Sequence, residues 1–112
     1  MNFSLQFIPL VRRQKLIEKI YTGLLPGGVF ILSEKILFED KHENDSMNEL
    51  HLHMKELNGY EKLEISSKRK SLEDVLISEK IDDHLDRLRQ AGFKDSFVWL
   101  KCFNFASFVA FK

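Results

Sequence analysis

The sequence has a single cysteine, two prolines and no excess of charge of either sign. Cys102 has no partner within the 112 residues, so an internal disulfide and a cysteine zinc site are both excluded. Its apolar neighbours predict a buried, inert thiol, and a reducing, cytoplasmic location fits this cysteine usage. Lys and Arg total 17 and Asp and Glu total 17, which argues against direct binding of nucleic acid or of an anionic membrane surface.

Long hydrophobic runs, repeats and low-complexity tracts are also missing. No run is long enough to span a membrane, and the first residues show no secretory-signal pattern. A chain of 112 residues is long enough for one domain with a modest core and too short for two. We therefore expect residues 1–112 to form a single unit.

The hydrophobic pattern of the first half predicts alternating strands and helices. Strict alternation over residues 2–7 is typical of a strand, and apolar residues recur at helical spacing over residues 9–22. The Pro-Gly-Gly turn at 26–28 leads into an apolar run, 29–32, of the kind that is buried on both faces of a sheet. Residues 36–38 extend this predicted strand.

The second half predicts helices followed by a hairpin. Apolar residues at steps of three and four, Met47 to Leu57, predict an amphipathic helix whose apolar side forms core or dimer contacts. Shorter helices are predicted over 72–76 and over 81–88, the latter ending at Gly92. Residues 97–103 and 105–111 predict an antiparallel hairpin, with its aromatic residues in the core. The order favours a parallel α/β sheet that ends in this hairpin.

The most informative segment is the junction at residues 24–35, where the turn leads through a strand to Ser33 and Glu34. Ligand sites in open α/β sheets lie outside the carboxyl ends of the strands, so these residues are placed where a site is expected. The G-x-G-x-x-G loop of a dinucleotide site is absent from the sequence. No oriented histidine base is evident for Ser33, and structural support is its expected role.

The histidines and the basic cluster predict no further site. His51 and His53 are two residues apart on a predicted helix and point to different faces, so we expect no shared metal. His42 and His84 are isolated in the sequence. The charges around Arg69 are by themselves typical of a solvated loop.

A set of short motifs spread over the whole chain resembles the carboxy-S-adenosylmethionine synthase family, formerly described as a tRNA wobble-uridine methyltransferase. The motifs include Asn2-Phe-Ser-Leu-Gln-Phe7, Pro26-Gly-Gly28, Leu32-Ser-Glu-Lys35, Phe38-Glu-Asp40, Asn58-Gly-Tyr60, Leu63-Glu-Ile-Ser66, Lys68-Arg69 and Cys102-Phe-Asn-Phe105. The resemblance implies that residues 1–112 are the C-terminal half of a class I S-adenosylmethionine-dependent methyltransferase domain, a Rossmann-like sheet ending in an antiparallel hairpin.

The resemblance also implies an activity. The family converts S-adenosylmethionine and prephenate into carboxy-S-adenosylmethionine and phenylpyruvate, and the product serves tRNA wobble modification. Matching its motifs residue by residue gives Asn2 a role in holding S-adenosylmethionine and Arg69 a role in holding a carboxylate. No metal is implied, and the family forms dimers.

The cofactor-binding half of the family pattern has no counterpart in these residues. The glycine-rich loop, the acidic residue for the ribose and the adenine-flanking segment all precede the matching region. We therefore expect the isolated chain to be inactive, with an unpaired strand edge at residues 2–7. The alternatives are a non-catalytic interaction module, one half of a split enzyme, or a methyltransferase with another acceptor.

Overall fold

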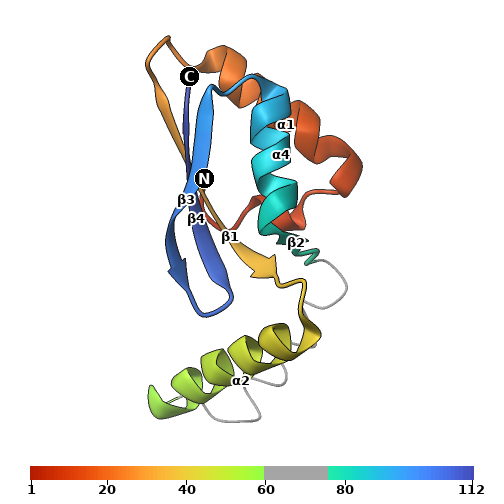
Figure 1. Ribbon diagram of the computed structural model, residues 1–112, viewed down its shortest axis with the longest axis vertical. Helices are drawn as coiled ribbons and strands as arrows, with labels where there is room; N and C mark the ends of the chain where they lie inside the picture. Colours follow the sequence, from red (N-terminus) through yellow and green to blue (C-terminus); the bar gives the residue numbers. More distant parts are fainter. Residues whose placement is uncertain (60–75) are drawn as a thin grey trace.

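The structure, a computed structural model, describes residues 1–59 and 76–112 (Figure 1). Its elements in chain order are the 3₁₀ helix η1 (Leu5–Phe7), α1 (Leu10–Gly23), β1 (Val29–Leu37), α2 (Lys41–Leu57), β2 (Glu79–Lys80), α4 (Ile81–Ala91), β3 (Asp95–Cys102) and β4 (Phe105–Phe111). The helix predicted at 72–76 lies almost entirely outside the described residues.

The four described strands form one mixed sheet in the order β2-β1-β4-β3. β1 pairs in parallel with β2 and antiparallel with β4, and β3 and β4 form a hairpin at the opposite edge. A bulge between Val98 and Leu100 shifts the register of β3, and Phe103 turns the hairpin with a left-handed φ of 52°. The predicted α/β sheet with a closing antiparallel hairpin is confirmed.

The expectation that the central strand is buried on both faces is wrong. Burial alternates along β1: Phe30 and Leu32 are buried, whereas Val29 and Ile31 are 47% and 43% exposed. Figure 1 shows the reason, since α1 and α4 lie side by side on one side of the sheet. The core forms between that face and these helices, and the other face, called here the open face, carries Val29 and Ile31.

The predicted strand at residues 2–7 is also wrong. Asn2 makes a single parallel bridge with Ser33, and the chain then leaves β1 through Phe3, whose φ of 53° is left-handed. The 3₁₀ helix η1 follows because the backbone N–H of Leu5 donates to the Glu34 carboxylate instead of to a neighbouring strand. A polar side chain inside the sheet therefore ends the pairing that the alternation predicted.

The first long helix follows the prediction closely, since α1 spans Leu10–Gly23 and is shifted by one residue from the predicted 9–22. α2 begins at Lys41, six residues before the predicted Met47, because Asp40 caps it by accepting a hydrogen bond from the His42 N–H. α4 ends at Gly92, where φ is 117° and an added Cβ would lie 2.9 Å from the Tyr21 ring. β2 was not predicted, because its two residues are too few to show the alternating apolar pattern of a strand.

Several apolar residues are more exposed than predicted. Trp99 and Phe97 are 54% and 50% exposed because they lie on the edge strand β3, and Cys102 on the same strand is exposed rather than buried. α2 contains no buried residue, with Leu57 75% exposed. In Figure 1 this helix projects beyond the end of the sheet, which explains its weak burial.

Candidate functional site

Asn2, the first of the two predicted ligand residues, lies beside β1 and is exposed. The Ser33 N–H donates to the Met1 carbonyl at 2.9 Å, and the Phe3 N–H donates to the Ser33 carbonyl at 2.7 Å. This parallel bridge holds the backbone of Asn2 on both sides. Asn2 is therefore fixed in position and open to solvent, as a ligand-binding residue requires. The second predicted residue, Arg69, lies outside the described residues.

The two polar residues of the junction lie within β1 rather than at its tip. β1 continues to Leu37, and Ser33 and Glu34 point to opposite faces. Ser33 Oγ and Ser107 Oγ are 2.8 Å apart on the open face, and Trp99 Nε1 donates to Ser107 Oγ at 2.8 Å. This network joins three strands of the sheet, so its geometry supports a structural role for Ser33.

Glu34 supports the turn that carries Asn2. Its side chain is fully buried, and Oε1 accepts the hydrogen bond from the Leu5 N–H at 2.9 Å. Burial raises the pKa of Glu34, while the backbone N–H groups of Leu5, Gln6 and Ser4 and the charge of Arg13 oppose that rise. The carboxyl group thus satisfies the start of η1, which would otherwise leave donors unpaired in the interior.

Arg13 holds the same turn from the other side. This buried guanidinium donates through Nε to the Ile8 carbonyl at 2.8 Å and through Nη2 to the carbonyls of Gln6 and Ile77 at 3.0 and 2.9 Å. Its Nη1 pairs with the carboxylate of Glu79. Because a guanidinium presents several donors in one plane, a single side chain ties α1 to the turn and to the segment before β2.

Glu79 joins this cluster to α4. It accepts hydrogen bonds from Arg13 and, at 2.7 Å, from Arg87 Nη2. Burial pushes the pKa of Glu79 upward, but the hydrogen bonds from Arg87 and Arg13 outweigh burial and hold the pKa below its usual value. The residues Glu34, Arg13, Glu79 and Arg87 together fix the position of the Asn2 turn on the sheet, and sequence reasoning predicted none of these long-range partners.

Aromatic side chains gather next to Asn2 on the open face. The rings of Phe3 and Phe105 meet edge to face with centroids 5.4 Å apart, and His51 meets the Phe105 ring at 4.9 Å. α2 brings His51 here, and Asn48 of the same helix accepts a hydrogen bond from the Asn104 side chain at 2.6 Å. Burial and the charges of Lys55 and Lys35 lower the pKa of His51. The sequence signal for this group was the position of Phe3, directly after Asn2.

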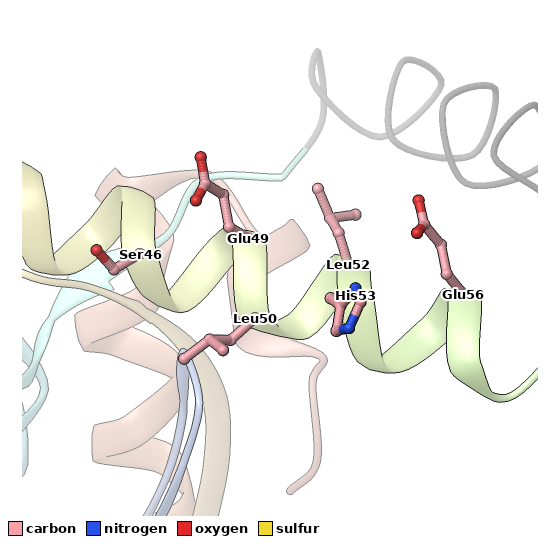
Figure 2. Close-up of a pocket in the computed structure, with 6 residues that line it drawn as sticks. All are labelled: Ser46, Glu49, Leu50, Leu52, His53 and Glu56. Carbon is pink, nitrogen blue, oxygen red and sulfur yellow. The ribbon is translucent and has the colours of Figure 1, made fainter.

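His53 faces elsewhere, as the helical spacing predicted. Figure 2 shows it on α2 among the residues that line a pocket, which are Ser46, Glu49, Leu50, Leu52, His53 and Glu56. The described side chains around this pocket all come from one helix and do not converge on a point. Within residues 1–59 and 76–112, no group of three or more His, Cys, Asp or Glu side chains is arranged to hold a metal ion.

The fold is found in other solved structures. PigF with SAH aligns with 99% of this chain at a TM-score of 0.65 and 22% identity, and the match covers 28% of PigF. A crystal structure of a Bordetella parapertussis protein, described as a possible exported protein, aligns with 99% of the chain at a TM-score of 0.63 and 14% identity, covering 37% of that protein. None of the described helices is long and apolar enough to cross a membrane. The chain thus shares the mixed α/β fold of these two solved structures.

Curated relatives give a more specific likeness. The chain is 50% identical over 112 residues to a carboxy-S-adenosyl-L-methionine synthase of Aliivibrio fischeri and 54% identical over 111 residues to one of Hydrogenovibrio crunogenus. These matches cover 100% and 99% of the chain but only 46% and 44% of the relatives. No protein-family model matches the chain. The chain is homologous throughout to carboxy-S-adenosyl-L-methionine synthases and spans about half the length of the curated relatives it matches.

Proposed function

We propose that this chain serves as the C-terminal half of a carboxy-S-adenosylmethionine synthase. The complete unit would convert S-adenosylmethionine and prephenate into carboxy-S-adenosylmethionine and phenylpyruvate, for use in tRNA wobble modification in the cytoplasm. The observation that carries the proposal is 50% identity over 112 residues to a synthase of this name. The prephenate substrate comes from the family resemblance.

Asn2 and Arg69 are the proposed ligand-binding residues. The exposure of Asn2 and the bridge that fixes its backbone support a role in holding S-adenosylmethionine. Arg69 would bind a carboxylate through a planar two-pronged fork, a geometry that lysine cannot reproduce. Prephenate would lose its ring carboxylate as CO2 together with its ring hydroxyl, which would leave as water with a proton from the S-methyl group of S-adenosylmethionine. The resulting sulfonium ylide would form a C–C bond with the CO2, and these residues would orient the two molecules without a metal.

The isolated chain is proposed to lack normal binding of S-adenosylmethionine. Within residues 1–59 and 76–112, Asn2 alone is proposed to contact S-adenosylmethionine. The 112 residues contain no glycine-rich loop that could bind the nucleoside. Calorimetric titration of the chain with S-adenosylmethionine should therefore give no micromolar binding. A micromolar dissociation constant would contradict this part of the proposal.

The activity can be tested by supplying the missing half. We would fuse the N-terminal part of the Aliivibrio fischeri synthase to this chain and follow carboxy-S-adenosylmethionine and phenylpyruvate formation by mass spectrometry. Product should depend on prephenate. Products formed only with another acceptor would instead identify a different methyltransferase-like activity and refute the proposal.

Arg69→Ala in that fusion tests whether Arg69 binds the carboxylate. We expect the variant to weaken binding of the carboxylated ligand about tenfold or more, since a charge-assisted bidentate contact is lost. Binding of S-adenosylmethionine itself should change little, and the Lys68→Ala variant serves as the matched control. Equal losses for both ligands would refute the assigned role of Arg69.

A second candidate function is that of an interaction module or one half of a split enzyme. The observation that favours it is the open face, where Phe97 and Trp99 are about half exposed. A separately expressed N-terminal half of the synthase, mixed with this chain, should then form a complex by size-exclusion chromatography. Prephenate-dependent activity of the mixture would indicate a split enzyme, and a complex without activity would indicate a module.

A further inference from the structure

Three side chains beside Asn2 form a small aromatic surface: Phe3, His51 and Phe105, called here the ring cluster. They come from the turn after Asn2, from α2 and from β4, and both outer rings contact Phe105 edge-on. Phe105 pairs with Lys35 in the register of β1 and β4, so the ring cluster lies on the open face, two residues beyond the Asn2–Ser33 bridge. The ring cluster therefore lies beside Asn2, the residue proposed to hold S-adenosylmethionine.

The backbone at Phe3 is not explained by core packing. A left-handed φ of 53° is unfavourable for a bulky residue, with a cost of order 1 kcal/mol or more. The Phe3 ring stays 44% exposed, so little burial offsets that cost. Phe3 lies in the turn that Glu34 and Arg13 hold, and this turn sets the Phe3 ring against Phe105 while part of the ring stays open to solvent.

The ring cluster also carries one polar group, the His51 imidazole. Burial, followed by the charges of Lys55 and Lys35, lowers the pKa of His51. The imidazole is therefore held neutral and can donate one hydrogen bond to a carboxylate or a hydroxyl. Aromatic edges and faces on the same surface suit an unsaturated ring.

We propose that Phe3, His51 and Phe105 bind the ring of the second substrate, an unsaturated cyclic compound that carries carboxylates. This inference rests on the proposed function, in which prephenate has this chemistry, and it adds the residues that would select the ring. His51 donates a hydrogen bond to a polar substituent of the ligand, while the two phenylalanines contact the ring itself.

The test is an NMR titration of the 112-residue chain with labelled histidine side chains and prephenate as the probe. We expect the His51 ring signals to shift saturably, and the His53 signals, on another face of the same helix, to stay unchanged. Succinate, a dicarboxylate without a ring, should not reproduce the shift. Failure of His51 to respond to millimolar prephenate, or an equal response to succinate, overturns the proposal.

Substitutions give the second readout in the fused synthase. His51→Gln and Phe3→Leu should each raise the KM for prephenate about fivefold while the KM for S-adenosylmethionine stays constant. His53→Gln is the matched control. Unchanged prephenate KM values in an active, prephenate-dependent fusion would overturn the ring cluster alone, whereas activity without prephenate would overturn the proposed function.

Discussion

Buried ionisable residues carry much of the specificity of this small fold. Arg13, Glu34 and His84 are all at most 2% exposed, yet the sequence placed none of them in the core. Each is buried for a different reason. Arg13 satisfies backbone carbonyls and Glu34 satisfies the N–H of Leu5, whereas neither ring nitrogen of His84 has a hydrogen-bond partner. Polar and charged side chains therefore both fix a turn and fill part of the core.

His84 should make the stability of the chain sensitive to mild acid. Burial lowers its pKa from 6.5 to about 4. As pH falls, the unfolded chain takes up the proton before the folded chain does. The contribution of His84 to the free energy of unfolding is therefore fully present above the unfolded pKa of 6.5 and is lost as pH falls toward the folded pKa of about 4. Urea unfolding should show a His84 contribution of about 2 kcal/mol lost between neutral pH and about pH 5.

The variant His84→Leu isolates that contribution, because a leucine fills the same apolar site beside Phe108 without titrating. The free energy of unfolding of the variant should fall by about 2 kcal/mol less than that of the original chain over the same pH interval. Parallel pH curves for the two proteins would show that His84 is not the group responsible.

Removing Glu79 should destabilise the chain far more than removing an exposed partner of an ion pair. Glu79→Ala leaves the buried Arg13 without its charged partner, at a cost of about 3 kcal/mol. Asp86→Ala breaks the exposed pair with Arg89 and should change the free energy of unfolding by less than about 0.5 kcal/mol. Chemical denaturation of both variants at neutral pH measures the contrast, and similar losses would contradict it.

At the scale of elements, the 3₁₀ helix η1 depends on one carboxyl group. Glu34→Ala removes the acceptor of the buried Leu5 N–H and should cost about 1–3 kcal/mol, with faster amide hydrogen exchange at Leu5. Glu34→Gln keeps an acceptor and should be tolerated better. Equal exchange at Leu5 in all three proteins would refute the role.

The ionisation of Glu34 should also make the stability depend on pH. Because burial raises the pKa of Glu34, the free energy of unfolding should fall as pH rises through that raised pKa, and the Glu34→Gln variant should not show this fall.

The elements that the sequence predicted well are those whose signal is local. α1, α4 and the β3–β4 hairpin follow from apolar spacing and from Gly92. η1 could not be predicted, because the alternation over residues 2–7 is the same whether or not Glu34 takes the Leu5 N–H. The side of β1 that is covered depends on which helices pack there, and its apolar run alone did not reveal this. Asn2 was predicted as a ligand residue from motif resemblance and stays a prediction, whereas the contacts of Glu34 and Arg13 join residues far apart in the sequence and could not be predicted.

At the scale of the whole molecule, the sheet has one covered and one open face. The open face carries Ile31 and Phe97, each about half exposed, with Trp99 held over it by its hydrogen bond to Ser107. An apolar surface of this kind favours contact with another protein surface. The chain also spans only 46% of a synthase to which it is similar. We propose that, when the N-terminal half is not present, two copies of the isolated chain associate through this open face.

Phe97→Glu should weaken this association without unfolding the chain. The side chain is 50% exposed on the edge strand β3, so a charge there stays solvated in the monomer but would be desolvated in the interface. Val11→Glu is the control, since Val11 is 89% exposed on α1, on the covered side of the sheet. Sedimentation velocity over a range of concentrations should show a dimer for the original chain and for Val11→Glu, and a monomer for Phe97→Glu. A monomer at every concentration for all three proteins, or equal dimerisation of the two variants, would show that the open face does not hold two copies together.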